Sequence, residues 1–143
     1  MKNSQATIEE VEAFLKEFKE RAKLFGIVYV DSKPNNVDTL NELEITPKER
    51  DGYVLSLTAE DYSQGPDAND YPGQNDVWVF GKFIKRKELY IKIFINAFLN
   101  KPNVCISFHI AKHPMSYPLK KKDWNYEKSI YRRQRHVNDR GDH

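Results

Sequence analysis

The chain has 143 residues, 31% of them charged, with a formal net charge of +2. This length fits a single domain with a modest hydrophobic core, and no apolar run approaches the roughly 20 residues that a membrane span needs. The polar N-terminus predicts no secretory signal, and the single cysteine, Cys105, excludes an internal disulfide and favours a cytoplasmic location.

Helical periodicity marks the first segment of the chain. Thr7 and Glu10 have the spacing of a capping box, in which each side chain accepts a hydrogen bond from the backbone amide of the other residue. Apolar residues then recur at helical spacing, and Gly26 suits the left-handed position after a helix end. These features predict a helix over residues 8–25, followed by a short strand over 27–30.

Shorter elements are predicted next. Residues 32–36 are predicted to form a turn around Pro34, and Asn36 would cap a short helix over residues 37–44. A second capping box, with proline at the first helical position, predicts a helix over 47–56, and one further turn is expected over 58–61. Residues 63–75 contain two glycines and two prolines and are predicted to form a loop, either a lid or binding loop or a solvated connector.

Residues 76–110 have the most regular pattern in the chain. Apolar residues, many of them β-branched, fall at every second position and are interrupted by short polar segments, which predicts a three-stranded antiparallel meander. We therefore expect an α+β fold, with an antiparallel sheet of about four or more strands and helices packed on one face. The residues expected on the apolar face are Val77, Val79, Leu89, Ile91, Ile93, Ile95, Val104, Ile106, Phe108 and Ile110.

The opposite face of the meander carries polar side chains. If the connection between the second and third strands is symmetric, Tyr90 lies opposite His109 and Lys92 lies opposite Ser107, with Cβ atoms about 5 Å apart. Lys82 is expected to share this face on the first strand. The pattern therefore predicts a phenol, an imidazole, ammonium groups and a hydroxyl on one side of one sheet.

Metal binding and hydrolase chemistry are less well supported by these residues. Cys105, His109 and His113 are spaced four residues apart, but four residues of a strand span about 13 Å, too far for 105 and 109 to share a zinc ion with bonds of about 2 Å. Ser107 precedes His109 without the motif of a nucleophile elbow, and no phosphate-binding glycine motif is present. We therefore expect no metal and no cofactor.

RNA cleavage without a metal fits the polar face better. The 2′-hydroxyl of RNA can attack its own phosphate if one group removes its proton and another protonates the leaving oxygen. His109 suits the acid or base role, Tyr90 suits a phosphate ligand or proton-transfer partner, and Lys92 would stabilise the developing charge. The residues expected to bind or steer RNA are Lys82, Lys85, Arg86, Lys87 and Ser107.

Charge is unevenly distributed along the chain. Residues 32–76 contain three basic and ten acidic side chains, whereas residues 77–143 contain fifteen basic and five acidic ones. A basic half is typical of proteins that bind a polyanion, although charged residues also simply solvate a surface. We expect one domain, with a globular part over 8–118 and a basic, flexible tail over 119–143 in which basic and aromatic residues are interleaved.

Short patterns in the right order resemble the MqsR-type mRNA interferase toxins. They lie at residues 57–62, 76–82, 89–93 and 104–109, within a region of similarity over 8–110. The resemblance implies a RelE-like fold and a sequence-selective, metal-independent ribonuclease. Such a protein cuts mRNA, on the ribosome or free, and is held inactive by an antitoxin protein.

The resemblance carries over the family's site only in part. Tyr90 matches the family's strand tyrosine, whereas His109 stands where the family has a lysine. Val79 replaces a glutamine of the family, and Gln64 falls near the position of another lysine. Because histidine transfers protons near neutrality better than lysine does, the resemblance implies a variant site. Two alternatives remain open: a non-catalytic module that binds RNA or a protein through the same face, and a structural subunit without a nucleic-acid role.

Overall fold

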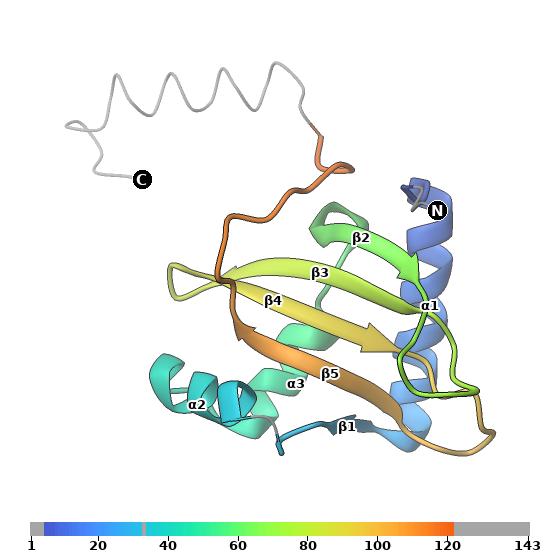
Figure 1. The fold of residues 1–143 in the computed structure, drawn as a ribbon, viewed down its shortest axis with the longest axis horizontal. Coiled ribbons are helices and arrows are strands. Elements are labelled where there is room, and N and C mark those ends of the chain that lie inside the picture. The colour runs from blue at the N-terminus through green and yellow to red at the C-terminus, as the bar shows by residue number, and fades with distance from the viewer. Residues whose placement is uncertain (1–4, 33, 122–143) are drawn as a thin grey trace.

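The computed structural model describes residues 5–32 and 34–121 (Figure 1). Its helices are α1 (Ile8–Phe25), α2 (Pro34–Leu43) and α3 (Pro47–Leu55), with one 3₁₀ turn, η1 (Ala59–Asp61). Its strands are β1 (Ile27–Tyr29), β2 (Tyr62–Asp67), β3 (Val77–Ile84), β4 (Lys87–Phe94) and β5 (Asn103–Ile110). Of the tail predicted over 119–143, residues 122–143 lie outside the described residues.

Capping boxes determine where two of the helices begin. At the start of α1 the Thr7 amide donates to Glu10 Oε1 at 2.9 Å, and the Glu10 amide donates to Thr7 Oγ1 at 3.1 Å. Thr46 and Glu49 form the same pair at the start of α3, at 2.8 and 3.1 Å. Each box satisfies two backbone amides that have no partner inside the helix. The predicted bounds of α1 are confirmed, and those of α3 are correct to within one residue.

A single five-stranded sheet organises the molecule, with strand order β1-β5-β4-β3-β2. The short β1 runs parallel to β5, and every other neighbouring pair is antiparallel. The predicted meander is therefore present as β3, β4 and β5, and the α+β class is confirmed. In the part of the chain that the structure describes, no helix has the length and apolar character needed to cross a membrane.

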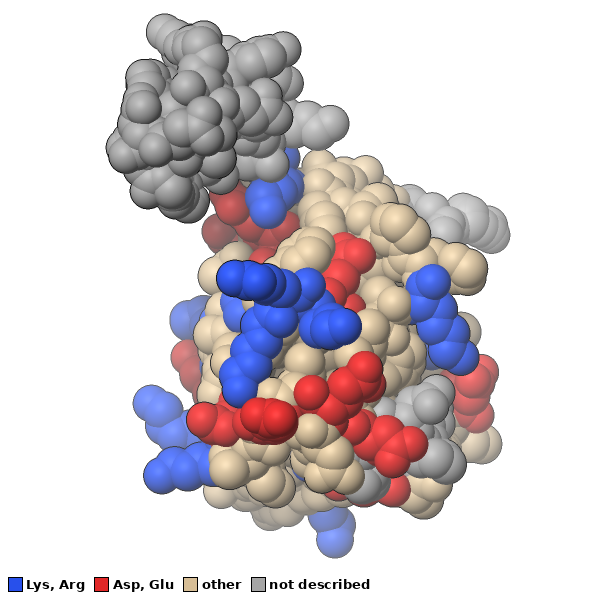
Figure 2. All heavy atoms as spheres, turned by 90° about the vertical axis from the view of Figure 1, so that its left-hand side faces the viewer, with Lys and Arg blue, Asp and Glu red and all other residues tan. Residues whose placement is uncertain are grey.

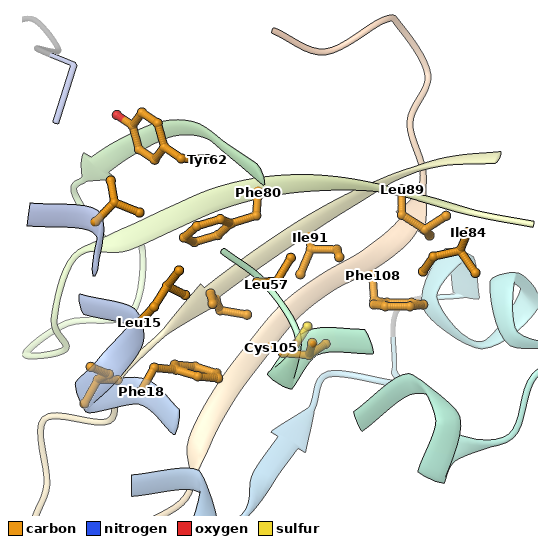
Figure 3. Packing of buried hydrophobic residues seen from close by; sticks show 14 of the residues in the cluster. Leu15, Phe18, Leu57, Tyr62, Phe80, Ile84, Leu89, Ile91, Cys105 and Phe108 are labelled. Atoms are coloured by element: carbon orange, nitrogen blue, oxygen red, sulfur yellow. The ribbon is translucent and has the colours of Figure 1, made fainter. Parts of the chain in front are cut away.

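The hydrophobic core lies between one face of the sheet and the helices (Figure 3). Leu15 and Phe18 of α1 and Leu57, just after α3, pack toward the sheet. The sheet contributes Phe80, Ile84, Leu89, Ile91 and Phe108, all at most 2% exposed. Full burial of such side chains contributes about 1.5–3 kcal/mol each, so this face is fixed as the interior and the opposite face of the sheet is left for other roles.

The predicted apolar face is only partly correct on β3. The register pairs Phe80 with Ile91 and Val79 with Lys92, so Phe80 faces the helices and Val79 lies on the opposite side. Residues 77–80 are all apolar, so alternation alone could not show which parity is buried.

A β-bulge changes the parity of β5. Cys105 rather than Ile106 lies opposite Ile93, so Ile106 is the extra residue of the bulge. A small apolar cluster results on the face away from the helices, formed by Val77, Phe94, Ile106 and the partly buried Val104. The expectation that Val77, Val79, Val104 and Ile106 face the helices is therefore wrong.

The predicted turn before Asn36 is also wrong, because α2 already begins at Pro34. Asn36 lies inside the helix and is almost fully buried. Its amide nitrogen donates to the carbonyl oxygens of Val30 and Ile106, both at 2.9 Å, and its oxygen accepts from the Phe108 amide at 3.1 Å. The side chain therefore supplies hydrogen-bond partners to the backbone groups of β5 that lie beyond the end of β1.

The predicted loop over 63–75 contains most of an additional strand, β2, which pairs with β3. Its ladder is irregular, with two register shifts. Gly65 has a φ of 117°, and a Cβ added there would lie only 2.9 Å from the Val77 carbonyl oxygen, so glycine is required at this point. Glycine and proline are depleted in strands, which explains why the sequence indicated a loop.

Candidate active site

Tyr90 and His109 lie side by side on the face of the sheet that the helices leave uncovered. The β4–β5 register places Tyr90 opposite His109 and Lys92 opposite Ser107, so both predicted pairs are confirmed. The two rings of the first pair are stacked, with centroids 5.2 Å apart and planes 13° from parallel. The structure therefore brings a phenol and an imidazole into direct contact.

The hydrogen bond of His109 fixes one of its ring nitrogens. Nδ1 lies 3.0 Å from the carbonyl oxygen of Ile110. A carbonyl oxygen can only accept, so Nδ1 carries the proton in this contact. Nε2 is then an acceptor in the neutral ring and a donor in the imidazolium. His109 is thus in the tautomer that can remove a proton through Nε2.

The environment of Tyr90 keeps its hydroxyl protonated. Partial burial raises the pKa of Tyr90, and the negative charge of Asp67 raises it further. Both effects disfavour the phenolate, since burial and a nearby like charge penalise the charged form. Tyr90 is therefore a hydrogen-bond donor near neutral pH rather than a base.

Residues 111–117, called the arch below, cover part of this face and are bound to Glu88 at both ends. The Ala111 amide donates to the Glu88 carbonyl oxygen at 2.8 Å, which extends the β5 ladder by one step. The Met115 amide donates to Glu88 Oε1 at 3.3 Å, and the Tyr117 hydroxyl donates to Glu88 Oε2 at 2.6 Å. Glu88 alone therefore anchors the beginning and the end of the arch.

Gly81 allows the arch to approach the sheet. It lies opposite Tyr90 on β3, and a Cβ built on it would lie 2.8 Å from a ring carbon of Tyr117 and 2.9 Å from Met115 Sδ. Only a glycine leaves room for this contact. Glycine in the interior of a strand often marks such a close approach, so the sequence did contain a signal for it.

A cavity of about 530 Å³ lies between the arch and the sheet. No Asp or Glu among the described residues lines it. The lining therefore offers two imidazoles, a phenol, an ammonium group and small polar groups, a combination suited to an anion. The lining residues are Ser63, Gln64, Tyr90, Ser107, His109, Ala111, Lys112, His113, Pro114, Met115 and Ser116.

A smaller hollow of about 250 Å³ also borders His109. It is lined in part by Asp38 and Glu42 of α2 and by Lys112. Acidic residues therefore line the smaller hollow, whereas none of the described residues that line the larger cavity is acidic. An anionic ligand would favour the larger cavity for this reason.

The remaining predicted site residues lie in different places. Lys92 is two residues after Tyr90 on β4 and lies on the same face of the sheet, but it does not line the cavity. The prediction that Lys82 shares the face of Tyr90 is wrong. Lys82 pairs with Leu89, which faces the core, so it lies on the opposite face, and its Nζ is 3.7 Å from an Asp61 carboxylate oxygen. The error follows from the parity of β3, which was assigned incorrectly.

The basic residues of the β3–β4 turn are at one end of the sheet. Lys85 Nζ donates to the carbonyl oxygens of Leu43 and Glu44, at 3.0 and 3.2 Å, and so binds the end of α2. Arg86 and Lys87 are exposed. Figure 2 shows that the basic side chains at this end lie directly beside acidic ones, so the surface here is mixed in charge.

Three residues of the cavity were missed as functional candidates in the sequence: Gln64, Lys112 and His113. Gln64 was considered only as a mismatch to the resemblance, and its neighbours fell in the predicted loop. It lies on β2 opposite Val79, and its amide nitrogen donates to Asp67 Oδ2 at 3.2 Å. His113 was considered only as a metal ligand. The bond between Glu88 and Tyr117 that folds the arch over the sheet had no local signal.

A metal site at Cys105 and His109 is incompatible with the structure. Cys105 is fully buried on the face toward the helices, whereas His109 lies on the opposite face. Across residues 5–32 and 34–121, no three His, Cys, Asp or Glu side chains come together in a group that could hold a metal ion.

Comparison with known proteins gives no assignment. No family model, no curated protein and no solved structure matches the chain.

Proposed function

We propose that this protein is an endoribonuclease that cleaves mRNA by attack of the 2′-hydroxyl on the adjacent phosphate, without a metal ion. The observation that carries the proposal is the cavity beside Tyr90 and His109. It combines imidazole, phenol and ammonium groups, and no carboxylate of the described residues lines it. These groups match the needs of an anionic phosphodiester whose cleavage requires proton transfer and charge stabilisation.

His109 and Tyr90 have complementary roles in this reaction. Nε2 of His109 removes the proton of the 2′-hydroxyl, because the hydrogen bond of Nδ1 to Ile110 leaves Nε2 as the acceptor. The 2′-oxygen then forms a bond to phosphorus. Tyr90, protonated because its pKa is raised, donates a hydrogen bond to a non-bridging oxygen of the phosphorane. The bond from phosphorus to the 5′-oxygen then breaks, and this oxygen takes up a proton from an acidic group of the cavity or from water, which gives a 2′,3′-cyclic phosphate and a 5′-hydroxyl.

Positive charge for the transition state comes from Lys112, which lines the cavity. Lys92, one row away on the same face, adds a more distant charge. Arg86 and Lys87, exposed at the β3–β4 turn, would steer the RNA together with Ser107 at the cavity. Lys82 and Lys85 are already bound to Asp61 and to the end of α2, so their contribution to RNA binding would require those contacts to break.

The resemblance to MqsR-type toxins supports the biological context of this proposal. It favours mRNA, on the ribosome or free, as the substrate and a cognate antitoxin protein as the partner that blocks the site. It also favours a cytoplasmic protein of a type II toxin–antitoxin system.

A second candidate function is an RNA-binding module without catalysis. Phe83, 64% exposed, lies on the same face as Tyr90, near the exposed Arg86 and Lys87. Aromatic rings beside cations bind single-stranded nucleic acid through stacking and phosphate contacts. This candidate predicts RNA that is bound but not shortened.

The test is cleavage of a fluorescently labelled messenger transcript by the full-length chain in the presence of EDTA. We expect fragments that end in a 2′,3′-cyclic phosphate, and about 100-fold or greater losses of rate in His109→Ala and Tyr90→Phe. Lys16→Ala, on the exposed side of α1, is the matched control and should cleave as the parent does. A shift of intact RNA on a gel, without fragments, would select the binding module instead.

A further inference from the structure

We propose that His113 of the arch is the general acid of this site, which protonates the leaving 5′-oxygen while His109 acts as the base. The inference rests on the proposed ribonuclease function and deepens it. It assigns a catalytic role to a residue that neither the strand pattern nor the resemblance included.

The first argument is the position of His113. It lines the same cavity as His109 but belongs to the arch, whereas His109 belongs to the sheet. In-line displacement at phosphorus places the attacking and leaving oxygens on opposite sides of the phosphate. A base and an acid that come from different walls of one cavity suit this arrangement.

The second argument is the chemistry that the other residues leave unfilled. The hydrogen bond of Nδ1 to Ile110 leaves Nε2 of the neutral His109 ring as an acceptor, so this residue can fill the base role. Partial burial and Asp67 raise the pKa of Tyr90, which makes its proton harder to release than that of an ordinary phenol. An imidazolium, with an ordinary pKa of about 6.5, loses its proton far more readily near neutral pH. His113 is the remaining residue of this type in the cavity lining.

The third argument is that the arch is a built element of the fold. Glu88 accepts hydrogen bonds from Ala111, Met115 and Tyr117, and so closes the arch on both sides of His113. Gly81 supplies the space under Tyr117. Pro114 follows His113 directly and restricts its backbone to extended conformations. The backbone on both sides of His113 is therefore held by several contacts rather than left to a free chain end.

The proton balance of the step is complete with these two residues. His109 gains the proton of the 2′-hydroxyl as the bond between oxygen and phosphorus forms. His113 gives its proton to the 5′-oxygen as the bond to phosphorus breaks. The titratable or charged groups that share the cavity with His113, or bind its arch, are Tyr90 of β4, His109 of β5, Lys112 of the arch and the Glu88 carboxylate.

The decisive experiment replaces the leaving oxygen by sulfur. The cleavage site is first mapped with the full-length parent protein, and an RNA oligonucleotide with that site is then made with either oxygen or sulfur at the bridging 5′ position. A thiolate leaves without protonation, so a general acid is needed only for the oxygen substrate. We expect His113→Gln to cleave the oxygen substrate about 100-fold or more slowly than the parent and the sulfur substrate at nearly the parent rate.

Two comparisons separate an acid from a structural residue. Tyr90→Phe and His109→Ala should slow both substrates by similar factors, because neither donates the proton to the leaving group. His113→Gln should also lose the alkaline limb of the pH–rate profile, since that limb reports deprotonation of the acid. Because His113 is exposed, this substitution should leave the thermal unfolding temperature unchanged.

The outcomes distinguish this inference from the proposed function. If the parent cleaves neither substrate, the ribonuclease proposal fails, and this inference fails with it. If the parent is active and His113→Gln cleaves the oxygen substrate as fast as the parent, only the inference is wrong. Equal losses on both substrates would likewise overturn the acid role.

Discussion

Replacing Gly81 with alanine should displace the arch and leave the sheet intact. A Cβ at this position would lie 2.8 Å from a ring carbon of Tyr117 and 2.9 Å from Met115 Sδ, so either β3 or the arch must move. β3 is paired with a strand on each side, whereas this end of the arch is bound to Glu88 by two hydrogen bonds. The arch is therefore the partner that moves.

The size of the effect follows from those contacts. Each hydrogen bond to the partly exposed Glu88 carboxylate contributes about 1–1.5 kcal/mol, and alanine is favoured over glycine in a strand by about 0.5–1 kcal/mol. If both hydrogen bonds are lost, the free energy of unfolding should therefore fall by about 1–2.5 kcal/mol in Gly81→Ala. RNA cleavage should fall further, by about 10- to 100-fold, because catalysis is sensitive to displacements of about 1 Å.

Gly52→Ala is the matched control for this substitution. Gly52 lies inside α3, and an added Cβ there has no atom within 4 Å, so alanine should stabilise the protein by about 0.5–1 kcal/mol. Trypsin cleavage after Lys112, an exposed residue of the arch, measures the opening of the arch without any reference to RNA. We expect faster cleavage at this bond in Gly81→Ala only. If the bond after Lys112 were cut at the parent rate and RNA cleavage were unchanged, the arch would not be closed on β3 as described.

Two further predictions concern stability away from the site. Arg50→Ala should lower the free energy of unfolding, measured in urea, by about 2–4 kcal/mol. The buried guanidinium donates two hydrogen bonds to Asp31 and lies 3.6 Å from the Tyr29 ring centroid. The control, Lys48→Ala at an exposed position, should stay within about 0.5 kcal/mol of the parent, and a similarly small loss in Arg50→Ala would contradict this prediction. The free energy of unfolding should also decline as the pH rises above about 10. Burial raises the pKa of Tyr29 in the folded state, so the unfolded chain loses this proton at a lower pH than the folded protein does. The contribution of Tyr29 to stability is therefore complete below that pH and is lost as the pH rises further. Burial also raises the pKa of Cys105 to about 12, which acts in the same direction. Tyr29→Phe should flatten the alkaline decline of urea midpoints, and an unchanged slope would show that Tyr29 does not cause it.

The facing of Tyr90 and His109 could be predicted because β4 alternates strictly and the pairing expected from a symmetric connection holds at these residues, beyond the bulge. Leu89, Ile91 and Ile93 are separated by Tyr90 and Lys92, so the parity of the strand is unambiguous. The same reasoning fails on β3, where apolar residues occupy both parities, and the misplacement of Lys82 follows from this ambiguity.

Other errors arise where a tertiary contact replaces a local rule. The bulge at Ile106 has no local marker, yet it transfers Val104 to the face away from the helices. Asn36 has the preference of a cap but binds the open edge of β5 from within α2. In both cases the deciding partner lies on another strand or on the far side of a long connection, which residue preferences do not encode.

The arch shows why a strand face alone was an incomplete description of the site. Glu88 and Tyr117 are 29 residues apart, so no periodic pattern could indicate their bond. The arch nevertheless decides which residues share the cavity: Lys112 lines it, whereas Lys92, predicted from the strand pattern, lies outside it. Electrostatic interactions are stronger where protein replaces water. Lys112 should therefore matter more than Lys92 for the reaction, although only Lys92 could be predicted from the sequence.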